Sequence, residues 1–211
     1  MQRVKWVIFD LGGIVISESK EYIDKSIAEY LDISIKQYHK LTEKYQHRLT
    51  TGDITLLQVY THIIRQLKIS IKPQSVLDKH LSIFREVSTQ KDSEILQMIV
   101  QLTKICSVGC LTNTEIEIAE LNKKTGLFDC FEKVYLSTEI GLRKPISSIY
   151  KYLLDDLGCS PKEVIFIDDK YENVESAQRI GINSIQFISV IQLRKYLSDI
   201  CKLTNLNFTQ K

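Results

Sequence analysis

Polar and charged residues stand at the ends of four short apolar runs in this 211-residue sequence. They are Asp10, the pair Thr112-Asn113, Lys144 (in the loop after its run) and the pair Asp168-Asp169. Three carboxylates near one lysine leave negative charge in excess, which favours a hard divalent cation such as Mg²⁺ bound together with a substrate phosphate. Asp10 could then attack phosphorus while the cation, Lys144 and Thr112 neutralise the phosphoryl oxygens. These residue types therefore suit phosphoryl transfer, which depends mainly on positioning and charge stabilisation.

Helix capping is the alternative interpretation of the same residues. Thr112 or Asn113 could cap a helix that starts near Glu115, and Asp169 could cap one that starts near Tyr171. Capping explains one residue at each place, but it does not explain a lysine, a hydroxyl and three carboxylates at one edge of a sheet. Since desolvating a carboxylate is costly, the sequence favours a functional site.

The scaffold that would bring these groups together is an α/β fold. Helical patterns at 92–105, 115–124, 146–157 and 171–180 alternate with apolar runs typical of buried strands, at 4–9, 107–111, 132–136, 164–167 and 184–187. This alternation predicts a Rossmann-like parallel sheet with helices on both faces. Ligands of such sheets bind beyond the carboxyl ends of the strands, where the four clusters lie.

The connection between the first two strands is too long for a simple crossover. Its surplus, residues 17–91, contains apolar stripes at 22–31, 35–49, 56–67 and 76–84, which predict an inserted four-helix-bundle cap. We therefore expect a core domain of 1–16 and 92–211 and a cap domain of 17–91. The histidines of the insert lack metal-ligand spacing and are expected at surface or boundary positions: His39, His47, His62 and His80. Most of its tyrosines are expected to pack in the bundle: Tyr22, Tyr30, Tyr38, Tyr45 and Tyr60.

Composition excludes several other classes of protein. A net charge of +2 gives no reason to expect nucleic acid or an anionic membrane as a partner. Five cysteines without a CxxC pair indicate neither a disulfide framework nor a zinc site. The apolar stretch at 4–16 is too short to span a membrane and lacks a signal-peptide cleavage site. We expect a cytoplasmic monomer that acts on a small molecule.

Four motifs follow one another along the sequence: VIFDLGG at 7–13, LTNT at 111–114, GLRKPISSIY at 141–150 and FIDDKYENVESA at 166–177. They resemble those of the haloacid dehalogenase (HAD) superfamily, in the branch with a helical cap after the first strand. The resemblance covers essentially the whole chain. Within the superfamily, the FDLG start and the YLS…GLRKP stretch are similar to α-D-glucose-1-phosphate phosphatase-like members, which implies a Mg²⁺-dependent hydrolase of small phosphorylated metabolites.

The resemblance also implies a role for each matching residue. Asp10 would be the nucleophile that becomes an aspartyl phosphate, and the phosphoryl group would be bound by Thr112, Asn113 and Lys144. Mg²⁺ would be held by Asp10, the backbone carbonyl of Gly12, and Asp168. Behind these ligands would lie Asn173, which holds a loop, and Asp169, which orients Lys144 or a metal-bound water.

One departure from the family pattern concerns proton transfer. Most phosphatases of the superfamily have a second aspartate two residues after the nucleophile as general acid and base, where this sequence has Gly12. Alkyl phosphates should therefore be poor substrates, whereas an anomeric sugar phosphate, with its less basic leaving oxygen, suffers less. Glu18 and Glu115 are candidate substitutes, although nothing in their spacing places either at the site.

Two alternative functions stay open. A 2-haloacid dehalogenase also lacks the second aspartate, but such enzymes need no metal and resemble Ser-Asn where this sequence has Asp168-Asp169. A catalytically weakened phosphate-binding protein is the other alternative, since the acid/base residue is missing. Residues that select the substrate are expected on the insert and at its hinges, near 17–20 and 89–91.

Overall fold

The fold is organised around a five-stranded parallel sheet in a computed structural model that describes residues 3–17, 20–88 and 92–203. The strands are β1 (Trp6–Phe9), β2 (Ser107–Thr112), β3 (Lys133–Leu136), β4 (Val164–Asp168) and β5 (Asn183–Gln186). Their order in the sheet is β3-β2-β1-β4-β5, and all neighbours are parallel. Each strand lies within two residues of its predicted bounds, so the predicted α/β class is confirmed.

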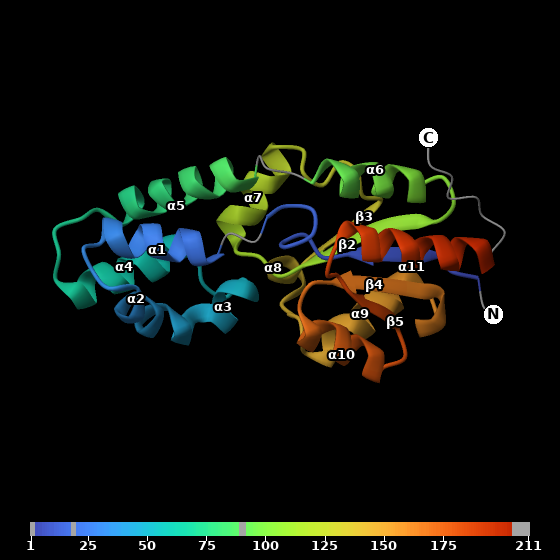
Figure 1. The fold of residues 1–211 in the computed structure, drawn as a ribbon. Coiled ribbons are helices and arrows are strands. Elements are labelled where there is room, and N and C mark those ends of the chain that lie inside the picture. Colours follow the sequence, from blue (N-terminus) through green and yellow to red (C-terminus); the bar gives the residue numbers. More distant parts are fainter. Residues whose placement is uncertain (1–2, 18–19, 89–91, 204–211) are drawn as a thin grey trace.

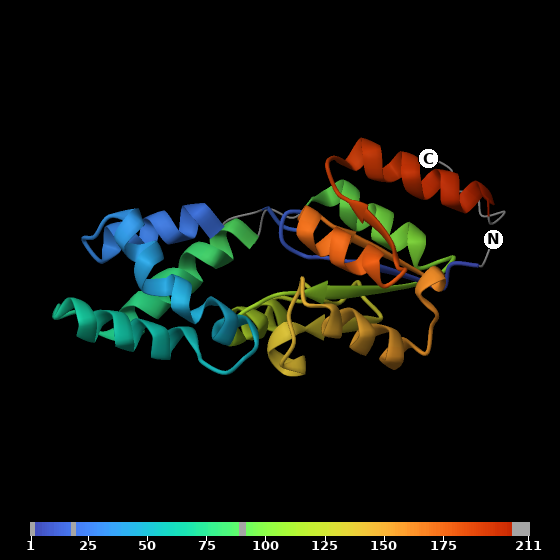
Figure 2. The same ribbon diagram turned by 90° about the horizontal axis from the view of Figure 1, so that it is seen from below.

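Helices cover both faces of the sheet (Figures 1 and 2). Alternate residues of β1 enter two different apolar clusters: Val7 and Phe9 in one, Trp6 and Ile8 in the other. The first cluster includes side chains of α6 (Ser93–Leu102), α7 (Ile116–Lys124) and α11 (Val190–Leu203). The second includes side chains of α9 (Ser147–Leu157) and α10 (Tyr171–Arg179). The period of two along a strand thus supplies both layers of the core. Two short elements complete this part, α8 (Ser137–Ile140) and the 3₁₀-helix η2 (Pro161–Glu163).

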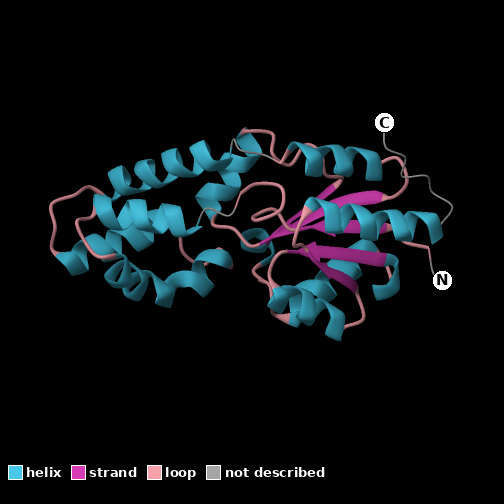
Figure 3. Cartoon of the chain, viewed as in Figure 1, coloured by secondary structure: helices cyan, strands magenta, loops and turns pink. Residues whose placement is uncertain are grey.

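The insert between β1 and α6 is helical and lies beyond the carboxyl ends of the strands (Figures 1 and 3). It consists of α1 (Lys20–Tyr30), α2 (Ile35–Thr42), the 3₁₀-helix η1 (Glu43–Tyr45), α3 (Gln46–Thr50), α4 (Leu56–Leu67) and α5 (Pro73–Ser88). The second predicted stripe is not one helix, because η1 interrupts it. At this break the Thr42 hydroxyl donates to the Tyr38 carbonyl at 3.1 Å, a backbone contact that commonly bends helices.

The two ends of the insert meet at the core. The backbone N–H of Asp92 donates to the Val15 carbonyl at 3.0 Å, and the Asp92 side chain then caps α6 through the Glu94 and Ile95 amides. The chain therefore leaves the sheet and returns to it at neighbouring points. No helix among the described residues is long and apolar enough to cross a membrane.

Most tyrosines of the insert pack in the bundle as expected, namely Tyr38, Tyr45 and Tyr60, but two tyrosines and one histidine lie elsewhere than their stripes suggest. Tyr22 and Tyr30 are exposed, because α1 turns Ile23 and Ile27 toward the bundle instead. His80 is buried rather than at the surface or a boundary, since it lies on the inner face of α5.

Candidate active site

The register of the sheet sets the positions of the first three site residues. Phe9, the last residue of β1, lies opposite Cys110 of β2 and Ile167 of β4. Asp10, Thr112 and Asp168 therefore emerge at the same edge, and all three are buried. The structure brings these residues together with Lys144, and Asp10, Thr112 and Lys144 line one pocket.

Lys144 is the centre of the cluster and is only 1% exposed. Its Nζ lies 2.8 Å from Asp10 Oδ1 and 2.7 Å from Asp168 Oδ2, and it donates to the Leu111 carbonyl at 2.8 Å. These partners use all three N–H donors of an ammonium group. Burial opposes the charge, but the two adjacent carboxylates outweigh it and raise the pKa of Lys144. The site thus holds a fixed positive charge between two aspartates.

The carboxylate of Asp10 is held on one side. Its Oδ1 accepts hydrogen bonds from Lys144 and from the backbone N–H of Leu11, the latter at 2.7 Å. Burial raises the pKa of Asp10 to about 6, and the nearby Asp168 adds to this rise, whereas Lys144 and the Leu11 amide oppose it. Binding a cation beside Asp10 would favour its charged form, because opposite charge lowers a carboxyl pKa.

Two asparagines fix the loops that carry these groups. The side-chain amide of Asn113 bonds with both backbone groups of Lys144, donating to its carbonyl at 2.9 Å and accepting from its N–H at 3.0 Å. Asn173 donates to both carboxylate oxygens of Asp168, at 2.9 and 3.0 Å. Asn113 and Asn173 therefore position the lysine and the aspartate, and phosphate binding by Asn113 stays a prediction.

The capping interpretation of these residues is wrong. The N-cap of α7 is Glu115 and that of α10 is Lys170, and neither has a side-chain capping bond. Thr112, Asn113 and Asp169 thus do not cap these helices. Their polar side chains are placed at the sheet edge for another reason.

Three carboxylates lie close enough together to hold a cation. Asp10, Asp168 and Asp169 each offer an oxygen, and these oxygens lie within 4.8 Å of one another. An all-oxygen set with a net negative charge suits Mg²⁺ in the chemistry of its donors. Gly13 leaves room for the Asp169 carboxylate, because a Cβ at Gly13, whose φ is +73°, would lie 2.6 Å from Asp169 Oδ2.

The structure places the Asp169 carboxylate in the same cluster as those of Asp10 and Asp168. Its role in orienting Lys144 or a metal-bound water stays a prediction. Coordination through the Gly12 carbonyl stays a prediction. Glu18 and the hinge segment 89–91 lie outside the described residues.

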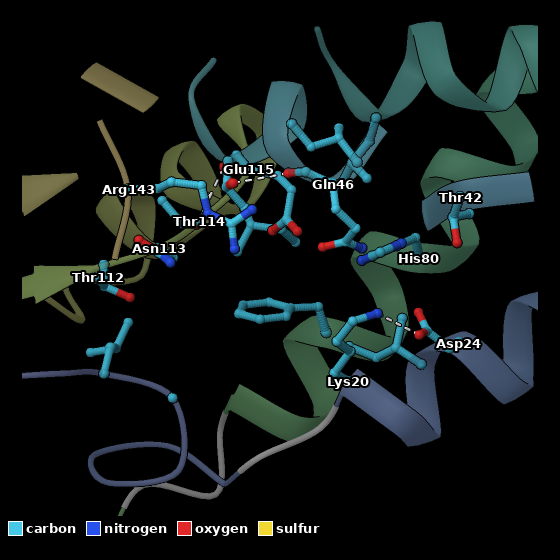
Figure 4. Close-up of a pocket in the computed structure, with 18 of the residues that line it drawn as sticks. Lys20, Asp24, Thr42, Gln46, His80, Thr112, Asn113, Thr114, Glu115 and Arg143 are labelled. Atoms are coloured by element: carbon cyan, nitrogen blue, oxygen red, sulfur yellow. Dashed lines mark hydrogen bonds and ion pairs between the residues drawn. The ribbon is translucent and has the colours of Figure 1, made fainter. Parts of the chain in front are cut away.

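The pocket above this cluster has a volume of about 290 Å³ and extends between the sheet edge and the insert (Figure 4). Figure 4 shows Thr112, Asn113 and Arg143 on the core side, and Lys20 and Asp24 on the side of the insert. Lys20 and Asp24 form an ion pair at 2.5 Å. This volume is at the lower end for small-molecule sites, which suits a small metabolite.

A chain of aromatic side chains forms the wall on the insert. The Tyr60 hydroxyl lies 2.5 Å from His80 Nδ1 and 3.4 Å from the Tyr38 hydroxyl. Burial lowers the pKa of His80 to about 4, so its ring is neutral at pH 7. The sequence does not mark the polar residues of this wall as site residues, because a side chain that faces a pocket and one that faces solvent follow the same pattern on a helix.

Comparison with known proteins identifies the family. A model of the haloacid dehalogenase-like hydrolases matches residues 4–181. The chain therefore belongs to this family of hydrolases, as the motifs predicted. The family match includes β1 to α10 and every residue of the cluster described above.

Individual relatives match over shorter stretches. D-ribitol-5-phosphate phosphatase of Bacteroides thetaiotaomicron is 28% identical over 113 residues, which cover 50% of this chain and 53% of that protein. A sesquiterpene phosphatase of Aspergillus oryzae is 40% identical over 55 residues, which cover 26% of this chain and 28% of that protein. The matches thus span about half or less of the length of these relatives.

Solved structures match over nearly the whole chain. A HAD-family enzyme of Bacteroides thetaiotaomicron, in complex with magnesium and inorganic phosphate, has a TM-score of 0.70 at 25% identity, covering 87% of this chain and 93% of that one. A HAD-like family hydrolase of Porphyromonas gingivalis has a TM-score of 0.74 at 20% identity, covering 93% and 98%. The second likeness concerns the fold alone.

Proposed function

We propose that this protein is a Mg²⁺-dependent phosphatase of a small phosphorylated metabolite that reacts through an aspartyl phosphate. The observation that carries the proposal is the buried Lys144, held between Asp10 and Asp168 at the bottom of a pocket. A fixed ammonium beside a carboxylate that can attack is an arrangement for binding and transferring an anionic group. The relatives that are phosphatases, and the neighbour bound to magnesium and phosphate, support the same reaction.

The residues of the chain would act in two steps. A carboxylate oxygen of Asp10 bonds to phosphorus while the bond from phosphorus to the leaving oxygen breaks, and that oxygen takes a proton from water. Water then attacks phosphorus in the aspartyl phosphate, and the bond from phosphorus to the Asp10 oxygen breaks, which releases inorganic phosphate and the Asp10 carboxylate. The proton lost by this water neutralises the hydroxide left by the first step. Lys144 and the buried Thr112 would stabilise the charge on the phosphoryl oxygens throughout.

A magnesium ion fits the carboxylate cluster by its donor chemistry. Asp10, Asp168 and Asp169, with the Gly12 carbonyl, would hold it. When bound, the ion supplies positive charge that compensates the phosphate and the aspartates.

The leaving group is expected to be a weak base. Gly12 has no carboxyl to protonate the leaving oxygen, and general acid catalysis typically contributes about 10²–10⁴-fold. A sugar phosphorylated at the anomeric oxygen, such as an anomeric hexose phosphate, would lose least. The helical insert, 17–91, would serve as the cap over the pocket, and 1–16 with 92–211 as the catalytic core.

Phosphate release from a panel of sugar, polyol and alkyl phosphates tests the proposal. We expect release with Mg²⁺, none with a chelator, and none from Asp10→Asn, whereas the exposed Asp155→Asn of α9 should behave like the wild type. Halide release from 2-chloropropionate without metal would instead establish a dehalogenase. Mg²⁺-dependent binding of vanadate without any turnover would establish a phosphate-binding protein.

A further inference from the structure

Glu115 occupies a position that its residue type does not favour. It is the N-cap of α7, where Ser, Thr, Asp and Asn stabilise a helix most, yet its side chain makes no capping hydrogen bond. The side chain instead lines the pocket and is partly buried there. A partly buried carboxylate that makes no capping hydrogen bond carries a desolvation cost, which is typical of residues kept for binding.

The surroundings of Glu115 leave its charge poorly compensated. Burial raises the pKa of Glu115, whereas its own backbone N–H and the Lys20 ammonium lower it. Lys20 is engaged by Asp24, and Glu115 has no ion pair among the described residues. Asp24 adds further negative charge on the opposite wall (Figure 4). This end of the pocket therefore accepts hydrogen bonds and needs a ligand that donates them.

The chemistry of this end selects among leaving groups. An ionised carboxylate has acceptor atoms only, so hydroxyl groups of a ligand can satisfy it. A hydrocarbon chain would remove water from the carboxylate without replacing its hydrogen bonds. Gln46, and the neutral His80 with its Tyr60 partner, add groups that hydrogen-bond to uncharged hydroxyls.

We propose that Glu115 is a specificity-determining residue that binds hydroxyl groups of an uncharged, polyhydroxylated leaving group at the end of the pocket formed with Lys20 and Asp24. This inference rests on the proposed phosphatase function and deepens it. Glu115 recognises the part of the substrate remote from phosphorus, and it selects a polyol or sugar phosphate over an alkyl or isoprenyl phosphate. Glu115 belongs to the core, whereas the residues that select the substrate were expected on the insert and at its hinges.

Two substrates of equal chain length test the role of the hydroxyls. D-Ribitol 5-phosphate and n-pentyl phosphate share a five-carbon chain and a primary phosphate, and they differ in the hydroxyl groups. Since both release a primary alcohol, the missing acid at Gly12 slows both and largely cancels in their ratio. The ratio of their kcat/KM values is measured for the wild type, Glu115→Leu, Glu115→Gln and the control Glu120→Gln, an exposed glutamate of the same helix. Acetyl phosphate, which is activated and small, establishes phosphatase activity of the wild type beforehand.

We expect Glu115→Leu to lower the ratio by about 10- to 100-fold, as for loss of a hydrogen bond to a charged group. Most of this change should lie in KM for ribitol 5-phosphate, because the contact is remote from phosphorus. Glu115→Gln should give a smaller change, and Glu120→Gln none. The melting temperatures of both Glu115 variants should equal or exceed that of the wild type.

Other results would overturn the inference. An unchanged ratio in both Glu115 variants of an active phosphatase would exclude the specificity role and leave the proposed function intact. Equal loss on both substrates together with a lower melting temperature would show a structural role instead. A wild type that is inactive on acetyl phosphate and on both matched substrates would overturn the phosphatase function, and the inference with it.

Discussion

Asp10→Asn should abolish turnover and, without metal, make the protein more stable. Burial and Asp168 raise the pKa of Asp10 to about 6, against an ordinary value of 3.8. An acid whose pKa is raised by folding contributes full stability below its unfolded pKa, and this contribution is lost as the pH rises through the folded value. At pH 8 the ionised Asp10 therefore lowers the free energy of unfolding by about 3 kcal/mol, which asparagine avoids.

Urea unfolding in a chelator, at pH 4 and at pH 8, measures this difference. The wild type should lose up to about 3 kcal/mol of unfolding free energy relative to Asp10→Asn between these two values. Asp155→Asn serves as the control, since Asp155 is exposed on α9. An Asp10→Asn variant less stable than the wild type at pH 8 would contradict the cost of the buried charge, and a folded variant that still releases phosphate in Mg²⁺ would contradict the nucleophile assignment.

Three further predictions concern other parts of the molecule. Burial lowers the pKa of His80 to about 4. The wild type should therefore lose about 3 kcal/mol of unfolding free energy as the pH falls from 7 to below 4, because the ring must become charged. In urea unfolding, His80→Gln should lack this loss of about 3 kcal/mol, since glutamine does not titrate. A matching pH dependence in the two proteins would contradict this. The carboxylate of Glu117 accepts hydrogen bonds from the first two backbone amides of α4, those of Leu56 and Leu57, both at 3.1 Å. Glu117→Gln should therefore lower the unfolding free energy by about 1–2 kcal/mol. An unchanged urea midpoint would argue against this contact. A Cβ at Gly12 meets nothing within 4 Å, so Gly12→Asp should fold and raise alkyl phosphate hydrolysis by about 10²–10⁴-fold; unchanged rates would show that another group already supplies the proton.

The strands and the residues at their ends could be predicted because strong local signals mark them. Runs such as 164–167 are apolar throughout, as expected for strands buried on both faces, and polar residues end them abruptly. Once the runs are aligned in one sheet, Asp10, Thr112 and Asp168 must share an edge. Lys144 is expected at the same edge because its loop follows the third strand, and the structure shows its contacts with Asp10 and Asp168.

The far end of the pocket depends on how two sets of helices meet, and no local pattern determines that. The sequence suggests Glu115 only as a substitute acid, whereas its place across the pocket from Asp24 follows from the packing of the insert against α7. Gly52 is an example of a contact between the insert and the core that no local pattern predicts. It precedes α4 with φ +81°, and a Cβ there would lie 2.5 Å from the Thr138 carbonyl. Such a close approach is specified by distant backbone, so the sequence around Gly52 predicts a turn and nothing about its neighbour. The sequence reasoning also assigned no helix after β5, where α11 follows.

The hydrogen bond from Asp92 to Val15 has a consequence for how the chain folds. An unstructured loop of about 75 residues would oppose closure of the sheet by roughly 4 kcal/mol of chain entropy. A helical bundle whose ends already lie side by side removes most of that penalty before β1 and β2 pair. If the insert folds first, it brings β1 and β2 close together before they pair. Substitutions that destabilise the insert should therefore slow formation of the sheet.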